Sequence, residues 1–227
     1  MRVKKIFFYY EDKEVWERSR AMFVDERIAL LERYQRQLKR EEEGKKEEKK
    51  EELLTIEQAK QGIEKGVITL FDGREIEIEK KIYFKQQIQV PILKNFYDAH
   101  EEDGTSAVYV NHEHEISQIL TYLDENMQEI PLEDWKKVLV NGMIASGLYA
   151  DVIKAEQTES LEYICFLVPS KKGDIYNIVF RMRGQERKFT GNFNCMKKEQ
   201  DPYGTILEAM VLKIGEWMLE KEGEAIE

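Results

Sequence analysis

The histidines and the carboxylates near them are the residues of this chain best suited to metal chemistry. All three histidines fall in one stretch with two aspartates: His100, His112, His114, Asp98 and Asp103. If a strand continued through His112 and His114, the two imidazoles would share one face and bind one divalent metal ion, such as zinc. A nearby acid would then act as general base, which describes a metal-dependent hydrolase or nuclease.

A helix start is the competing interpretation of the same residues. Asn111 is a suitable N-cap, and Glu113 and Glu115 suit a first helical turn beside the positive end of the helix dipole. The apolar residues of 116–123 recur at helical spacing, which favours this interpretation. Residues two apart on a helix point in different directions, so His112 and His114 would not chelate one ion.

The stretch from Asn95 to Trp135 has a second unusual property, its charge. It contains no Lys or Arg and eleven Asp or Glu residues, within a chain of formal net charge −10. A concentrated negative surface bears on partners and association rates rather than on fold. It indicates recognition of a basic protein partner.

A non-enzymatic protein-binding module is therefore the preferred hypothesis. Acids would steer association and aromatic rings would supply contact area, because charge sets rate and specificity more than affinity. The expected contact residues are Asp98, Glu101, Glu102, Asp103, Glu113, Glu115, Phe96, Tyr97 and Tyr109. Acidic immunity proteins that block nucleases and acidic secretion chaperones are similar in charge and helix–sheet–helix architecture, without a shared motif.

A basic segment, 171–198, shows the opposite bias. Its cations and rings resemble a nucleic-acid-binding strand pair: Arg181, Arg183, Arg187 and Lys188 with Phe189 and Phe193. Apolar residues alternate with them as in an ordinary half-buried strand, and the isoelectric point of about 5.1 opposes general nucleic-acid affinity. Alternatively, the acidic and basic segments neutralise each other.

Composition and motifs exclude several classes of protein. The chain has 42% hydrophobic and 11% aromatic residues, enough for a sizeable core. No apolar run approaches the ~18 residues of a membrane span, and the N-terminus is a poor secretory signal. No phosphate loop, nucleophile elbow, C-x-x-C or H-E-x-x-H occurs. With only Cys165 and Cys195, we expect a soluble, cytoplasmic protein without a disulfide framework.

Residues 1–52 are expected to form a separate N-terminal part. A strand over 3–10 precedes a helix from Asp12 to about Arg40, and the charged block 39–52 forms a stalk or a tether. The helix carries an apolar stripe that includes Trp16, Phe23 and Leu30. This stripe is either core or a surface for oligomerisation, so the oligomeric state stays open.

Residues 53–227 are expected to form an α+β core of antiparallel sheets built from hairpins, with flanking helices. Thr55 and Gln58 predict a capped helix, and Asp72-Gly73 predicts a tight hairpin between 67–71 and 75–84. Further strands are predicted at 88–93, 107–110, 161–168, 175–182 and 187–193, and helices at 116–123, 131–146 and from Asp201-Pro202. This order also fits two α-β-β-β-α lobes, 53–127 and 128–227.

Overall fold

The computed structural model describes residues 53–85, 88–125, 129–183 and 188–224. The chain divides into two units, with the boundary between Glu52 and Leu53. The N-terminal strand, the helix with its Trp16 stripe and the charged block 39–52 lie outside the described residues.

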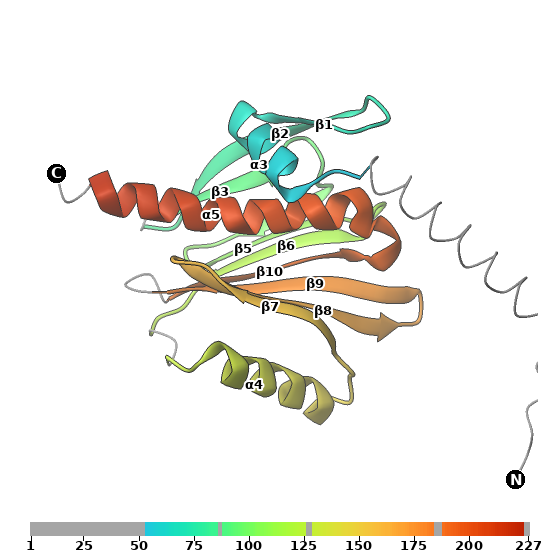
Figure 1. The fold of residues 1–227 in the computed structure, drawn as a ribbon, viewed down its shortest axis with the longest axis vertical. Coiled ribbons are helices and arrows are strands. Elements are labelled where there is room, and N and C mark those ends of the chain that lie inside the picture. The colour runs from blue at the N-terminus through green and yellow to red at the C-terminus, as the bar shows by residue number, and fades with distance from the viewer. Residues whose placement is uncertain (1–52, 86–87, 126–128, 184–187, 225–227) are drawn as a thin grey trace, which may run out of the picture. The chain divides into compact units, whose positions relative to one another are not determined.

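The described part is an α+β fold with two antiparallel sheets, as the sequence predicts (Figure 1). The small sheet has the order β1-β2-β3, and its strands are Val67–Thr69, Glu75–Tyr83 and Ile88–Leu93. The large sheet has the order β4-β5-β6-β10-β9-β8-β7. Its strands are Ala99–Glu102 (β4), Ser106–Asn111 (β5), Ile116–Tyr122 (β6), Asp151–Gln157 (β7), Leu161–Ser170 (β8), Gly173–Met182 (β9) and Phe189–Met196 (β10).

The pairing of β6 with β10 joins the two halves of the core. Asn192 of β10 lies opposite Ile119 of β6, and the pairing runs antiparallel from Phe189 to Asn194. Strands from 53–127 and from 128–227 thus belong to one sheet, and the described core is not divided into two α-β-β-β-α lobes.

Three α-helices flank the described sheets. Helix α3, Ile56–Lys65, begins with the predicted capping box, in which Thr55 and Gln58 each bond the other's main-chain N–H, and ends at Gly66. Helix α4 spans Leu132–Ala145 and α5 spans Thr205–Glu224. Helix α5 was expected to start at Asp201-Pro202, but the backbone at Asp201 is non-helical and the regular helix begins at Thr205. None of the described helices is long and apolar enough to cross a membrane.

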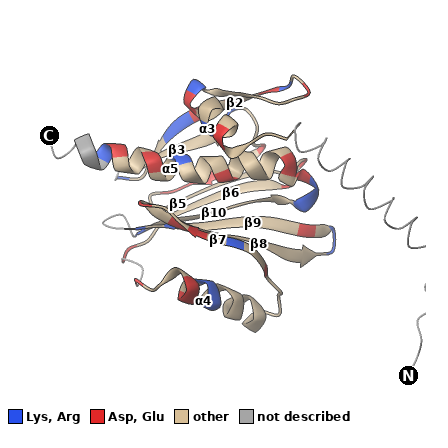
Figure 2. Ribbon diagram, viewed as in Figure 1, with Lys and Arg blue, Asp and Glu red and all other residues tan. Residues whose placement is uncertain are grey.

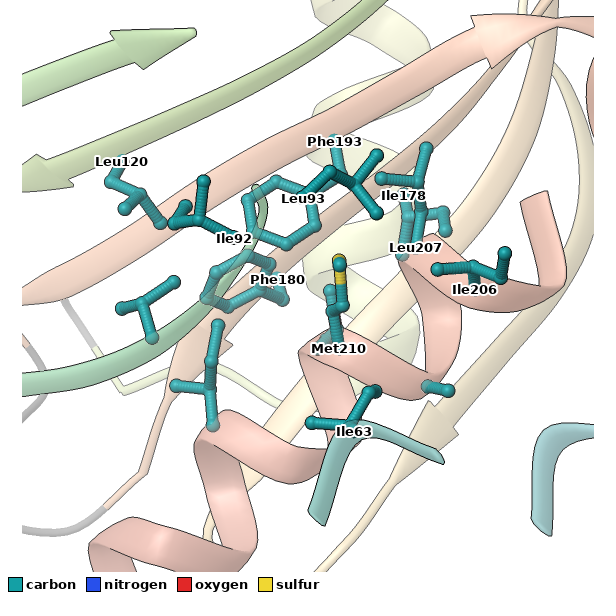
Figure 3. Close-up of a cluster of buried hydrophobic side chains, with 14 of the residues drawn as sticks. Ile63, Ile92, Leu93, Leu120, Ile178, Phe180, Phe193, Ile206, Leu207 and Met210 are labelled. Carbon is teal, nitrogen blue, oxygen red and sulfur yellow. The ribbon is translucent and has the colours of Figure 1, made fainter. Parts of the chain in front are cut away.

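The main core lies between one face of the large sheet and α5, together with α3 and β3 (Figure 3). Phe180 and Phe193 from the sheet meet Met210 from α5, and Ile63 of α3 and Ile92 of β3 lie in the same cluster. Alternate residues of β10 are buried, because its other face is only half-covered. Removal of this apolar surface from water is the main force that holds the layers together.

Helix α4 covers part of the opposite face, over β7, β8 and β9. Ile164, Phe166 and Val168 form a satellite core with Trp135 and Leu139 of α4. The first eight residues of β8 are therefore buried on both faces.

An arginine beneath α4 fastens the start of this helix to the sheet. Arg181 donates to Glu162 at 2.6 Å and to the carbonyl oxygen of Ile130 at 2.6 Å. The ring centroid of Trp135 lies 4.5 Å from the guanidinium of Arg181, which adds a cation–π contact. One buried cation thus holds a strand, a loop and a helix together.

One further predicted element was wrong, and two strands were missed. Residues 116–123 form strand β6 rather than a helix, and strands β4 and β7 were not predicted. The helix predicted at 131–146 is confirmed as α4. The remaining predicted strands, at 88–93, 107–110, 161–168, 175–182 and 187–193, are all present within a few residues of the expected bounds.

Candidate functional site

The predicted acidic residues gather at one edge of the large sheet, on strand β4 and its turns. All four residues of β4 are exposed, Glu101 and Glu102 among them. In the described part of the chain no basic side chain lies within ion-pair distance of either. We call Asp98, Glu101, Glu102 and Asp103 the acidic edge.

The turn between β4 and β5 depends on Asp103. Its Oδ1 accepts from the main-chain N–H of Thr105 and of Ser106, both at 2.7 Å. These two bonds, with a third from the Thr105 hydroxyl, lower the pKa of Asp103 below its ordinary value. Asp103 therefore stays ionised and holds the hairpin, so its carboxylate is a structural group as well as a surface charge.

The opposite end of β4 is fixed by Asp98. Its Oδ2 accepts from the main-chain N–H of His112 at 2.9 Å, and its Oδ1 lies 2.5 Å from Nδ1 of the same residue. These two bonds lower the pKa of Asp98, the main-chain bond most. Asp98 is thus engaged by its own fold, and the acids with free carboxylates on the described β4 are Glu101 and Glu102.

The segment between β5 and β6 is a turn, so neither the strand nor the helix interpretation of His112 and His114 is right. Asn111 does not cap a helix: its side chain accepts from the N–H of His114 at 2.8 Å within the turn. Glu115 has a positive φ of 52° before β6 begins at Ile116.

The three histidines have different neighbours. His112 is bound to Asp98, whereas His114 stacks on Phe96 with ring centroids 5.4 Å apart. His100 stacks on Tyr109, at 5.7 Å. Within the described residues no group of three or more His, Cys, Asp or Glu side chains is placed to hold a metal ion. The imidazoles are used as packing and hydrogen-bonding groups of the hairpins.

The acidic and basic segments meet at both ends of β6, because Glu115 precedes the strand and Asp124 follows it. Glu115 forms an ion pair with Lys172, which lowers the pKa of Glu115. Lys188 donates to the carbonyl oxygen of Asp124. Glu115 is therefore partly neutralised, unlike the exposed Glu101 and Glu102. Arg187 of the basic hairpin lies outside the described residues.

The aromatic residues proposed as contact area lie mostly beneath the acidic edge. Tyr109 is 3% exposed, and its hydroxyl lies 2.7 Å from that of Tyr83. Tyr97 donates to the buried Gln118, and burial raises the pKa of Tyr97 far above its ordinary value. Tyr109 is too buried to contact a partner, so this part of the prediction is corrected. Phe96 and Tyr97 are half-buried. Together these rings form a rigid support for β4.

A buried polar network at the opposite edge strand, β7, was not found from the sequence. Lys154 of β7 pairs with Glu208 of α5, whose side chain is 8% exposed. The hydroxyl of Tyr163 lies 2.5 Å from Oε2 of Glu156 and 3.0 Å from Oε1 of Glu208. Every charged group here has a partner, as burial requires. The spacing of these residues, 154, 156, 163 and 208, gives no local signal, since β7, β8 and α5 come together only in the fold.

The two thiols are poorly suited to nucleophilic chemistry. Cys165 and Cys195 are both buried, and burial raises the pKa of each to about 12. A hydrogen bond with Tyr176 offsets only part of this for Cys165. Both thiols stay protonated at neutral pH.

Two further surface features lie away from the acidic edge. A groove of about 270 Å³ runs between α3 and the β1–β2 hairpin, lined by Leu54, Gln58, Gly62, Ile68 and Phe71 among others. The second half of α4 carries no charge (Figure 2). The exposed apolar side chains in this region are Val138 and Ile144 of α4, Leu148 and Tyr149 after it, and Ile153 of β7, at 46% to 63%. Neither feature has the charge that a basic partner needs.

Comparisons with known proteins identify no relative: no family model matches this chain, and no curated protein matches it. The assignment of function therefore depends on the geometry of the site.

Proposed function

We propose that this protein is a non-enzymatic binding module that recognises a basic protein partner through the acidic edge. The observation that carries the proposal is the pair Glu101 and Glu102. Both are exposed on a regular strand, and both lack a counter-ion among the described residues. Two unpaired carboxylates on one strand repel each other weakly in the free protein. A cation that approaches them reduces this repulsion.

The support under the strand favours recognition over a merely solvated surface. Tyr109 packs against His100 of β4 and is itself contacted by Tyr83 and Tyr97, and Asp98 and Asp103 fix the two ends of the strand. A rigid edge loses little conformational entropy when a partner binds, so more of the contact free energy appears as affinity. Glu113, exposed on the neighbouring turn, extends the same negative surface.

The cellular setting belongs to this proposal. We propose a cytoplasmic protein, because both cysteines are unpaired, as is usual in a reducing compartment. An immunity-protein-like or secretion-chaperone-like role would suit such a surface, since both classes mask a cationic partner. No observation favours the alternative of a metal-dependent hydrolase, because His100, His112 and His114 have different partners in the described structure.

Affinity capture with matched variants tests the proposal. The full chain, Glu101→Lys/Glu102→Lys and Glu75→Lys/Glu159→Lys are each immobilised and exposed to lysate of the native host at low and high salt. Glu75 and Glu159, the control residues, are also exposed and also have no ion-pair partner among the described residues. The two double variants change the net charge of the protein by the same amount. We expect one basic protein on the wild type and on the control, weakened by salt and absent from the Glu101/Glu102 variant. Equal retention on all three proteins would contradict the proposal.

A further inference from the structure

The main-chain groups of β4 alternate between facing β5 and facing outward. Asp103 donates to the carbonyl oxygen of Ser106 at 2.8 Å, and Glu101 lies opposite Val108 in the same register. In an antiparallel ladder only every second residue exchanges hydrogen bonds with the neighbouring strand. His100 and Glu102 are the intervening residues, so their N–H and C=O groups point away from β5.

The neighbouring pairing gives the same assignment. Tyr122 of β6 donates to the carbonyl oxygen of Thr105 at 2.7 Å. The odd-numbered residues of β5 therefore bond to β6 and its even-numbered residues bond to β4. Stacking of the His100 and Tyr109 rings is also typical of a non-hydrogen-bonded cross-strand pair, whose side chains lie closer together.

The two edges of the large sheet differ in how open they are. At β7 the register shifts between Val152 and Lys154, which is a β-bulge, and such bulges disrupt pairing with a further strand. Strand β4 has continuous register over its four residues, all of them exposed. Among the described strands none pairs with the outer side of β4. This edge can therefore accept another strand.

The negative charge of β4 determines which kind of strand can pair with it. A second copy of the chain would place Glu101 and Glu102 opposite the same acids, and like charges directly across a strand pair are destabilising. A strand rich in Lys or Arg would instead place the Cβ atoms of its basic residues about 5 Å from those of the opposing acids, within reach of an ion pair. The side chains of His100 and Glu102 lie on the Tyr109 face of the sheet and that of Glu101 on the opposite face. Cations are thus favoured on both faces of the added strand.

We propose that an extended, Lys- or Arg-rich segment of the partner binds by adding a strand to the outer edge of β4. The inference rests on the proposed function and specifies how the acidic edge binds. Main-chain bonds to His100 and Glu102 fix the segment in place, and the carboxylates of Glu101 and Glu102 select its charge.

A proline at position 100 separates strand addition from attraction between charges. His100→Pro removes one outward N–H, keeps every acid, and leaves the β4–β5 bonds because that N–H does not take part in them. His100→Ala is the matched control for loss of the imidazole. The probe is an octapeptide of the sequence Lys-Lys-Thr-Thr-Lys-Lys-Thr-Thr, which places Lys on both faces of a strand, together with the same peptide fully N-methylated along its backbone. Affinity is measured at low ionic strength by calorimetry, and amide hydrogen exchange is followed by NMR.

We expect the unmodified peptide to bind wild type and His100→Ala equally, and to bind His100→Pro about fivefold more weakly, the loss of one hydrogen bond. It should slow exchange at the amides of His100 and Glu102, and the N-methylated peptide should not bind. Equal binding of both peptides to all three proteins would overturn strand addition while leaving charge recognition intact. Failure of the unmodified peptide to bind wild type would also reject strand addition. Loss of peptide binding in Glu101→Lys/Glu102→Lys tests the proposed function separately.

Discussion

The N–H of Asp103 donates to the carbonyl oxygen of Ser106 at 2.8 Å. This bond determines which main-chain groups of β4 point toward β5 and which point outward from the sheet edge. It fixes the register in which Glu101 faces β5 through its main chain while His100 and Glu102 face outward. The Asp103 carboxylate holds the same turn through Thr105 and Ser106. The acid at the end of the strand thus orients the backbone of the acids within it.

Substitutions of Asp103 should therefore distinguish the effect of its charge from its effect on the geometry of the β4–β5 turn. Asp103→Asn keeps an acceptor for the Thr105 and Ser106 amides, whereas Asp103→Ala removes it. We expect the melting temperature to fall more for Asp103→Ala than for Asp103→Asn. Amide exchange at Glu101 and Val108, which face each other as a hydrogen-bonded pair, reports the state of the hairpin in each variant. An equal fall in melting temperature for Asp103→Asn and Asp103→Ala would show that the turn needs the charge rather than the acceptor.

Arg181 should be among the residues most costly to truncate. Its side chain and that of Glu162 are each 8% exposed, and the same guanidinium bonds Ile130 and covers Trp135. Arg181→Ala leaves the buried carboxylate of Glu162 with Arg183 alone, at 4.0 Å, and breaking a buried pair costs about 3–5 kcal/mol. Urea denaturation measures the loss, and Trp135 fluorescence reports the position of α4. Arg181→Met combined with Glu162→Leu should recover most of the stability, and no recovery would contradict this account.

Two glycines give opposite expectations for the same substitution. A Cβ at Gly191 would lie 2.6 Å from two ring atoms of Phe180 and 2.7 Å from the carbonyl oxygen of Ile119, whereas one at Gly142 meets nothing within 4 Å. Gly191→Ala should destabilise the protein by about 1–3 kcal/mol through overpacking. Gly142→Ala, inside α4, should stabilise it by up to about 1 kcal/mol because alanine favours helix. Denaturant midpoints of the two variants on the same side of wild type would contradict the packing described.

Stability should decline in alkaline solution. Burial raises the pKa of Cys165 and of Cys195 to about 12, while an unfolded thiol ionises near 9. Their contribution is complete below about pH 9 and is lost between about pH 9 and 12, at roughly 1.4 kcal/mol per pH unit for each thiol. Urea denaturation at pH 8 and pH 10 should show the decline. The free energy of unfolding should fall less between these two pH values in Cys165→Ala/Cys195→Ala. An equal fall in this variant would show that groups other than the two thiols cause it.

The fold could be predicted from sequence where the signals are local. The Thr55–Gln58 capping box and the Asp72-Gly73 turn are read from a few adjacent residues, and both are present. Strand β6 was mistaken for a helix because its buried face includes Gln118, a polar residue that breaks the apolar alternation. Gln118 is buried without penalty because Tyr97 and Met210 provide hydrogen-bond partners, which no local pattern reveals.

The edge strands were missed for the same kind of reason. Strand β4 has no buried residue, so it has no apolar alternation to recognise. Strand β7 turns Lys154 toward α5, and only its partner Glu208, far along the chain, makes that burial acceptable. The acids of the site were found from charge alone. Only the fold shows how these acids differ. Glu101 and Glu102 are exposed and unpaired, Asp98 and Asp103 are hydrogen-bonded within their own turns, and Glu115 is paired with Lys172.

The central claim is tested most directly by calorimetric titration of the captured basic protein into three forms of the full chain. These are the wild type, Glu101→Lys/Glu102→Lys, and the control Glu75→Lys/Glu159→Lys. We predict that affinity falls more than tenfold for the first variant and changes less than about threefold for the control, with both differences shrinking at high salt. Equal affinities for the two variants would show that net charge, and not the acidic edge, attracts the partner, and would contradict the account.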